Sequence, residues 1–389
     1  MASCSKRPAP AAADDETCCK RRRFRIGSTA DYEETGCPGK GGFGAVIKAR
    51  HRVTGETVAI KFPLPPDEID GEPADVLREA RFLEAACHGN PHVVASHGLL
   101  RDTPTSSLCL AMEFVGGPSL HAFLLKRRGG PPLLESFVRS LMLQLLTGAD
   151  KMHKRGIVHR DIKPENVLLG DDGRIAKICD LGLAMSLKTE PPYTEAGTLP
   201  SMAPEMLLGK PDYDARVDTW SLGCVMAELI TGETLFGDGR DEDGQLLDIF
   251  RVLGLPDEKT WPGFTSLPHA EMPQLLFRLE EEEEGRQHRT GLGQLFTQEM
   301  LSEDGFQVLE GLLACNPDER LTAAAALELP WFAPPVVQPI EIIPPATPAK
   351  KKNVLRIKKP ATIPQPRTAI KKKNVLRIPL AMWKKGQSV

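Results

Sequence analysis

His159-Arg160-Asp161-Ile162-Lys163-Pro164-Glu165-Asn166 decides the fold, together with Asp180-Leu181-Gly182 after a short apolar segment. The first stretch is a polar turn between apolar runs. It can hold one carboxylate against the proton of a nucleophile, while an amide and a second carboxylate bind a metal ion. Phosphoryl transfer needs this division of labour, because its catalysis is mostly positioning and charge neutralisation.

Composition indicates a globular enzyme. The chain has 389 residues, of which 41% are hydrophobic and 26% charged, and this leaves room for a substantial core. No apolar run is long enough to span a bilayer and no apolar signal core is present, so we expect a chain that is neither secreted nor membrane-embedded. The nine cysteines, including adjacent Cys18-Cys19, predict reduced thiols rather than a disulfide framework or a zinc site.

Two further motifs precede the polar turn. Gly39-Lys40-Gly41-Gly42-Phe43-Gly44 would let backbone N–H groups approach phosphates, although glycine-rich hairpins are frequent. The β-branched run Val58–Lys61 ends in a lysine that suits a phosphate better than a packed core. Pro73–Glu79 opens a helical pattern in which Glu79 is the candidate partner of Lys61; by periodicity alone it is an exposed helix glutamate.

The order and spacing of these motifs resemble those of eukaryotic protein kinases. Within that family, Pro73–Glu79, Thr219–Leu229 and Leu247–Glu258 resemble cyclin-dependent kinases of the CMGC group, and the resemblance covers Tyr32 to Phe332. It implies an α+β, two-lobed fold. The N-lobe, residues 32–115, would hold a small antiparallel β-sheet with one regulatory helix, and the C-lobe, residues 118–332, would be mainly helical.

The resemblance also implies roles for individual residues, with ATP and Mg²⁺ as cofactors. Asp161 would accept or orient the proton of the substrate hydroxyl, and Lys163 would neutralise the γ-phosphate. Asn166 and Asp180 would hold Mg²⁺. The implied ATP-binding set is Gly39, Lys40, Gly41, Gly42, Phe43, Gly44, Val46, Ala59, Lys61, Glu79, Met112, Glu113, Val115 and Leu168, of which the apolar members are equally explicable as core.

The resemblance also implies residues that regulate the kinase and residues that stabilise its fold. Thr194, or Tyr193 beside it, is the candidate activation-loop phosphorylation site, and Arg78 and Arg160 would clamp its phosphate. The remaining three are structural: Glu205 would pair with Arg320, and Asp218 would tie down the backbone of the catalytic turn.

Departures from the family pattern modify these expectations. Gly42-Phe43 replace a Thr-Tyr pair that takes inhibitory phosphates, so that control should be absent. Met185 replaces an arginine that helps to bind the activating phosphate. Gly197 and Pro200-Ser201-Met202 replace residues that build the pocket for proline after the target Ser/Thr. We therefore expect neither a requirement for proline nor strict cyclin dependence. Leu181 replaces phenylalanine and should pack rather than bind a ligand.

The two ends of the chain are basic and are predicted to be disordered, over residues 1–31 and 333–389. Lys6-Arg7 and Lys20–Arg23 resemble a bipartite nuclear-import signal, so the expected location is the nucleus, the cytoplasm or both; a solvated basic patch is the alternative. The C-terminal tail repeats Lys350–Ile357 as Lys371–Ile378. These repeats suit docking peptides, import signals or nonspecific nucleic-acid contacts, and a functionless duplication is equally open.

The function that follows is transfer of the ATP γ-phosphate to Ser/Thr hydroxyls of protein substrates. A cyclin-like activator at the Pro73–Glu79 helix and docking partners for the repeats are the expected partners. No membrane contact and no sequence-specific nucleic-acid binding are expected. The alternative is a pseudokinase scaffold that recruits partners through the repeats. Such scaffolds lose the lysine, the catalytic aspartate or the metal aspartate, whereas this chain keeps Lys61, Asp161 and Asp180.

Overall fold

The computed structural model describes residues 26–41, 44–63, 73–237, 241–271 and 291–333. The chain divides into two compact units, Met1–Pro335 and Val336–Val389. The second unit with its repeats lies outside the described residues, as do the basic clusters near the N-terminus and Gly42-Phe43 of the glycine-rich stretch. No helix in the described ranges is both long and apolar enough to cross a bilayer.

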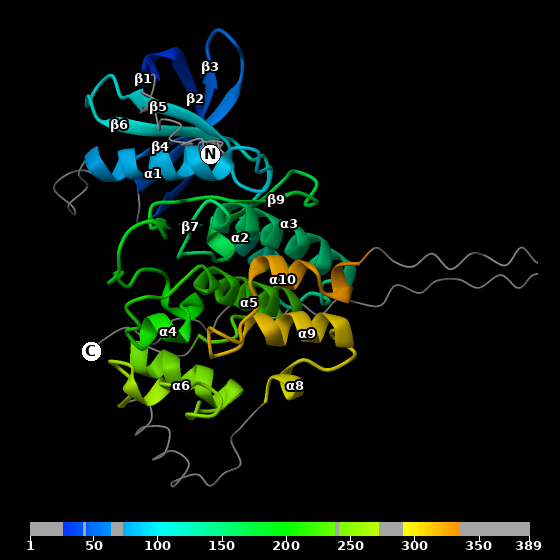
Figure 1. The fold of residues 1–389 in the computed structure, drawn as a ribbon. Helices are drawn as coiled ribbons and strands as arrows, with labels where there is room; N and C mark the ends of the chain where they lie inside the picture. The colour runs from blue at the N-terminus through cyan, green and yellow to red at the C-terminus, as the bar shows by residue number, and fades with distance from the viewer. Residues whose placement is uncertain (1–25, 42–43, 64–72, 238–240, 272–290, 334–389) are drawn as a thin grey trace, which may run out of the picture. The chain divides into compact units, whose positions relative to one another are not determined.

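A six-stranded sheet forms the N-lobe, in the order β1-β5-β6-β4-β3-β2 (Figure 1). Its strands are β1 (Ile26–Ser28), β2 (Tyr32–Gly41), β3 (Gly44–His51), β4 (Thr57–Phe62), β5 (Ser96–Arg101) and β6 (Leu108–Glu113). Successive side chains along β4 point to opposite faces of the sheet, so the strand contributes to the buried residues on both faces. Val58 and Ile60 join a small cluster on one face, whereas Ala59 belongs to the main core on the other. Neighbouring strands are antiparallel, as predicted, except β1 and β5.

The prediction of a structureless tail through Asp31 is wrong for residues 26–31. β1 pairs in parallel with β5, from Ile26 opposite Leu99 to Ser28 opposite Arg101, and the 3-10 turn η1 (Thr29–Asp31) follows. The Thr29 hydroxyl donates to Asp102 Oδ1 at 3.1 Å and accepts from the Thr103 N–H at 3.0 Å. Without β1, the edge of β5 would expose unpaired backbone N–H and C=O groups. β1 pairs with these groups, although it is too short to show a hydrophobic pattern in the sequence.

The regulatory helix α1 (Pro73–Cys87) packs against one face of this sheet. Ala80, Leu83 and Ala86 recur at helical spacing and are buried in the main core. The same packing buries Glu79, at 8% exposed. The regulatory helix is therefore present where the sequence predicts it, and it carries a charged side chain into the interior.

Two glycines connect the lobes. β6 ends at Glu113, and α2 (Leu120–Arg127) begins after Ser119, whose hydroxyl accepts from the Ala122 N–H. A Cβ on Gly117 would lie 2.5 Å from the carbonyl oxygen of Leu169, and one on Gly116 would lie 2.4 Å from the Asp171 carboxylate. At Gly117 the connection therefore passes too close to the backbone of the following hairpin for a larger residue, whereas the neighbour of Gly116 is a side chain.

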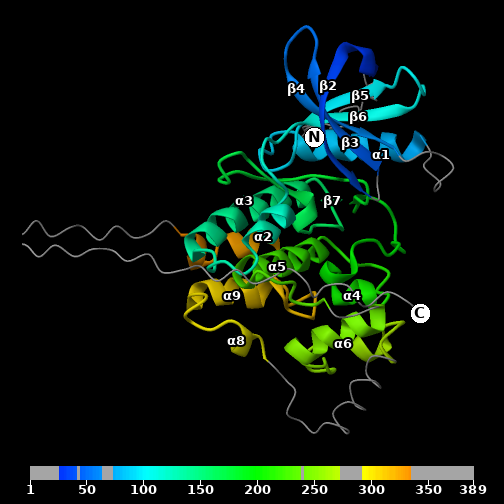
Figure 2. The ribbon, with the colours of Figure 1, turned by 180° about the vertical axis from the view of Figure 1, so that it is seen from behind.

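The C-lobe is mainly helical, as predicted, and is centred on α3 (Glu135–His153) and α5 (Arg216–Thr231), which pack on each other (Figures 1 and 2). The other helices are α4 (Pro204–Leu207), α6 (Glu242–Leu253), α8 (Leu292–Leu295), α9 (Glu303–Leu312) and α10 (Ala323–Leu327). Short elements carry the site: β7 (Ile157–Val158), η2 (Pro164–Asn166), β8 (Val167–Leu169), β9 (Ala176–Ile178), β10 (Met185–Ser186) and η3 (Leu199–Ser201), with η4 (Phe264–Ser266) and η5 (Pro330–Phe332) at the periphery.

Candidate active site

Lys61, at the end of β4, lies between two carboxylates. Its Nζ is 2.8 Å from Glu79 Oε1 on α1 and 2.9 Å from Asp180 Oδ1, which follows β9. Burial alone would lower the pKa of the Lys61 ammonium, but the charges of Glu79 and Asp180 outweigh it and raise the pKa above its usual value. The predicted Lys61–Glu79 pair is thus present, and it extends across the lobes to Asp180.

The catalytic turn between β7 and β8 is fixed by Asp218 on α5. The Asp218 carboxylate accepts from the backbone N–H groups of His159 at 2.9 Å and Arg160 at 2.8 Å, and from His153 Nε2 at 2.8 Å. Burial would raise the pKa of this carboxyl group, yet the hydrogen bonds and charge of His153 hold it below its usual value. Asp218 lies where the sequence predicts, and the contact explains how Arg160 keeps a φ of 69°.

Three side chains contact the Asp161 carboxylate. Asn166 Nδ2 donates to Asp161 Oδ2 at 2.9 Å, and Lys163 Nζ lies 2.9 Å from the same oxygen. The Thr198 hydroxyl donates to Asp161 Oδ1 at 2.6 Å and accepts from Lys163 Nζ at 2.5 Å. Sequence analysis missed Thr198 as a site residue. The Gly197-Thr198 pair before the Ala203-Pro204-Glu205 turn was the available signal.

Asn166 and Asp180 offer oxygen ligands for a metal ion. Asn166 uses its Nδ2 on Asp161, and Asp180 Oδ1 accepts from Lys61 and from the Gly182 N–H at 3.2 Å. Asn166 Oδ1 and Asp180 Oδ2 accept no hydrogen bond from the described residues. Amide and carboxylate oxygens are the ligands that Mg²⁺ prefers, so this donor set fits the ion. Asp180 has a φ of 62°, a left-handed conformation that is costly away from functional sites.

The residues that are predicted to contact adenine lie near the connection between the two lobes. Ala59 and Met112 are opposite each other on β4 and β6, and each is 8% exposed. Val46 and Leu168 are half-buried and pack against the same core. The Glu113 N–H already donates to Ala95 O at 2.9 Å, which leaves only its carbonyl for a nucleotide.

The remaining predicted nucleotide contacts are only partly described. Val115 is half-buried beyond β6. The backbone of Gly39, Lys40 and Gly41 pairs with β3 up to Gly44, and Gly42-Phe43 lie outside the described residues.

The two predicted phosphate-binding arginines make separate contacts. Arg160 Nε donates to Leu183 O at 2.7 Å, and its Nη1 donates to Thr194 O and to the Tyr213 hydroxyl, both at 2.9 Å. Arg78 on α1 donates to Gly182 O at 2.8 Å. Both arginines therefore bind backbone carbonyls that follow Asp180.

The two phosphorylation candidates differ in their surroundings. Thr194 is exposed, whereas the Tyr193 hydroxyl donates to Thr189 O at 3.0 Å.

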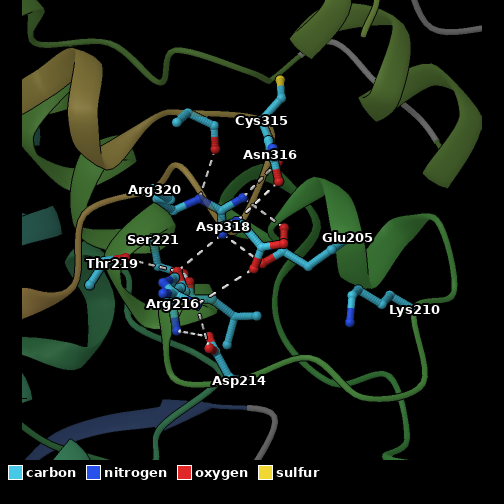
Figure 3. Close-up of polar contacts among 12 residues, drawn as sticks. Glu205, Lys210, Asp214, Arg216, Thr219, Ser221, Cys315, Asn316, Asp318 and Arg320 are labelled. Atoms are coloured by element: carbon cyan, nitrogen blue, oxygen red, sulfur yellow. Dashed lines mark hydrogen bonds and ion pairs between the residues drawn. The ribbon is translucent and has the colours of Figure 1, made fainter. Parts of the chain in front are cut away.

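Glu205 ends the predicted activation segment, Glu190–Glu205, and forms a buried bidentate ion pair with Arg320 (Figure 3). Arg320 Nη1 and Nη2 donate to the two Glu205 oxygens at 2.6 and 2.7 Å. The arginine also donates to the carbonyls of Ala314, Arg216 and Cys315. This predicted pair fastens the end of the activation segment to the chain after α9.

The departures from the family pattern have physical consequences. Leu181 is 1% exposed and lies in the main core, so it packs as expected. Met185 in β10 is buried, and no arginine stands there to bind a phosphate. Gly197 has a φ of 140°, and a Cβ there would lie 2.8 Å from Arg160 O. This backbone conformation strains any residue with a side chain.

A comparison with known protein families gives the same boundaries as the resemblance seen in the sequence, Tyr32 to Phe332. The protein kinase domain model matches residues 32–332. The chain is 46% identical over 319 residues to a putative cyclin-dependent kinase F-2 from Oryza sativa subsp. japonica, covering 79% of this chain and 93% of that protein. It is 36% identical to cyclin-dependent kinase G-2 from Oryza sativa subsp. indica over 78% of this chain, but spans only 42% of that longer protein. It is 35% identical to cyclin-dependent kinase 14 from Callithrix jacchus, covering 79% of this chain and 69% of that protein.

Membership of this family implies use of ATP and action on protein substrates, and it does not favour a pseudokinase. The site agrees, because Lys61, Asp161 and Asp180, which pseudokinases are expected to lose, are all present and in contact with their expected neighbours. The chain belongs to the protein kinase family, as a cyclin-dependent-kinase-like serine/threonine kinase.

Proposed function

We propose that this kinase transfers the γ-phosphate of Mg²⁺-bound ATP to Ser/Thr hydroxyls of proteins without requiring proline after the target residue. The observation that carries the proposal is the pair of linked clusters, Glu79–Lys61–Asp180 and Asn166–Asp161–Lys163. The first reaches across both lobes and the second lies on the catalytic turn. Together they supply the lysine, carboxylates and amide that phosphoryl transfer uses.

The residues divide the work by their chemistry. Asp161 orients the substrate hydroxyl and accepts its proton, and Lys163 and Lys61 neutralise phosphate charge. Asn166 and Asp180 hold Mg²⁺, which supplies charge neutralisation on the phosphates when bound. The Thr198 hydroxyl bridges Lys163 and Asp161 and keeps both in place, so it is a positioning residue.

The proposed regulation follows from the residues of the activation segment. Phosphorylation of exposed Thr194 would place a dianion near Arg160, which already donates to the Thr194 carbonyl. A cyclin-like subunit would bind the α1 face, where Arg78 is exposed. Gly197 supports the absence of a proline requirement, because it replaces the family's valine in the segment that would form the proline pocket.

The tails are proposed as adaptors outside the 32–332 catalytic region. The basic clusters at Lys6-Arg7 and Lys20–Arg23 would direct nuclear import, and the two C-terminal repeats would dock partners. Nuclear accumulation of a fluorescent fusion that survives alanine substitution of Lys20–Arg23 would contradict the import role.

The test is transfer from Mg²⁺-ATP to a library of Ser/Thr peptides, with the Asp180→Asn variant alongside. Transfer by the wild type that the variant loses supports the proposed reaction. Equal rates for peptides with and without proline after the target support the specificity. Absence of transfer by the wild type, even with cyclins and an activating kinase supplied, would refute the proposed reaction.

A further inference from the structure

A basic cavity lies between α1 and the residues in and beside β7 and β10. Its volume is about 510 Å³. Arg78 and Arg81 line it from α1, Arg155 lines it from the residues before β7, and Lys188 lines it from just after β10. The other lining residues are Phe82, Ala85, Ile157 and Ser186. Among the described residues no carboxylate lines the cavity, and four cations surround one hydroxyl group.

These cations are poorly neutralised. Arg81 and Lys188 are exposed and form no ion pair with any described residue. Arg155 donates only to backbone carbonyls, those of Lys151 and His88. Arg78 has a carboxylate, Asp75, at 3.6 Å, but both side chains are about half exposed and such a pair contributes little. The described residues that line the cavity therefore carry an excess of positive charge.

Ser186 is the residue that can bring negative charge into it. It is half-buried, ends β10 and pairs with Ile157 of β7. Its hydroxyl oxygen accepts from the Lys188 N–H at 3.2 Å. A phosphate there would add a charge of about −2 and three acceptor oxygens among side chains that are rich in donors.

We propose that Ser186 is a regulatory phosphorylation site whose phosphate binds this cavity. In the modifying reaction the Ser186 oxygen bonds to the γ-phosphorus of ATP, and the bond from that phosphorus to the β,γ-bridging oxygen breaks. ADP leaves with the electron pair, and the serine proton passes to the base of the modifying kinase. The phosphate then joins Arg78 and Arg81 of α1 to Arg155 and Lys188 of the C-lobe.

This link acts on the active site through α1. Glu79 follows Arg78 directly, so a phosphate that holds Arg78 and Arg81 also holds Glu79 against Lys61. The site differs from the one at Thr194, because Arg160, which contacts the Thr194 carbonyl, does not line the cavity. Only the effect on transfer depends on the proposed function; binding of the phosphate does not.

The test uses full-length protein with phosphoserine encoded at position 186, and a matched control with phosphoserine at exposed Ser266. The second pKa of each phosphate is measured by ³¹P NMR. An exposed phosphoserine titrates near 6, and nearby cations should lower the Ser186 value by about one unit or more. The double variant Arg81→Ala and Lys188→Ala should move it back toward the Ser266 value. Equal pKa values at the two positions would overturn the proposal.

Two further measurements complete the test. Tandem mass spectrometry of the protein recovered from its own cells should find phosphate on Ser186, and its absence would also overturn the proposal. Phosphorylated protein should transfer phosphate to peptides several-fold faster than Ser186→Ala protein, and equal rates would refute regulation. Because Ser186→Ala protein measures basal transfer, failure of the regulatory site stays distinct from failure of the kinase reaction.

Discussion

The ion pair between Glu205 and Arg320 allows a quantitative prediction for Glu205→Gln. The side chains are 1% and 0% exposed, and the pair has two hydrogen bonds of 2.6 and 2.7 Å. The glutamine keeps one acceptor oxygen, faces the second guanidinium nitrogen with an amide and leaves the arginine charge unpaired. Breaking a buried pair from one side costs about 3–5 kcal/mol. Arg320 keeps three backbone carbonyl partners, so we expect the lower end, about 3 kcal/mol.

Urea unfolding at pH 7, followed by circular dichroism, measures this cost. With a slope of about 3 kcal/mol/M, the midpoint should fall by about 1 M at an unchanged slope. Arg50→Gln is the matched control, because Arg50 forms a single 3.1 Å contact with Glu33 and both side chains are more than half exposed. It should change the free energy of unfolding by less than about 0.5 kcal/mol. Equal shifts for the two variants would refute the argument that burial decides the contribution.

Three further predictions concern the catalytic turn and the hinge. Thr198→Val should lower kcat by about 10- to 100-fold with little change in the KM for ATP, while Thr198→Ser restores activity; an unchanged kcat contradicts the positioning role. Folding lowers the pKa of the Asp218 carboxyl group. The carboxylate therefore stabilises the fold fully at pH values above the pKa of an unfolded aspartate, about 3.9. This stabilisation is lost as the pH falls through the lower pKa of the folded state. Asp218→Asn should therefore be less stable at pH 7 but show a flatter loss between about pH 5 and 3 in acid titrations of unfolding. Gly117→Ala should lower the free energy of unfolding by about 1–3 kcal/mol and raise the KM for ATP, because the new Cβ meets a backbone carbonyl. Gly116→Ala should have a smaller effect, because its Cβ meets a side chain that can rotate away. Equal effects of the two substitutions would contradict this distinction.

The sequence was sufficient for residues that belong to motifs matching the protein kinase pattern. Lys61 lies near the end of β4 and Glu79 lies on α1, where periodicity alone would leave it exposed; the match of the surrounding motifs to protein kinases is what predicted the pair. The same holds for Asp218 at the start of α5, whose contacts with backbone N–H groups of the catalytic turn are those that the resemblance implied.

The rest depends on tertiary contacts that local pattern does not encode. Thr198 joins the site only because the activation segment returns over Asp161, a separation of 37 residues. β1 is held by the edge of β5 and has no pattern of its own. The separate contacts of Arg78 and Arg160 depend on which carbonyls after Asp180 lie nearest to each arginine.

The most direct measurement of catalysis compares the wild type with Asp161→Asn, for ATP binding by calorimetry and for phosphate transfer to a Ser/Thr peptide. Asp161 contacts Asn166, Lys163 and Thr198 but makes no hydrogen bond with Lys61 or Asp180. We therefore expect the variant to bind Mg²⁺-ATP within about threefold of the wild type and to transfer phosphate at least about 100-fold more slowly. Transfer at the wild-type rate by the variant, or no transfer by either protein, would contradict the assignment of Asp161 as the catalytic residue of an active kinase.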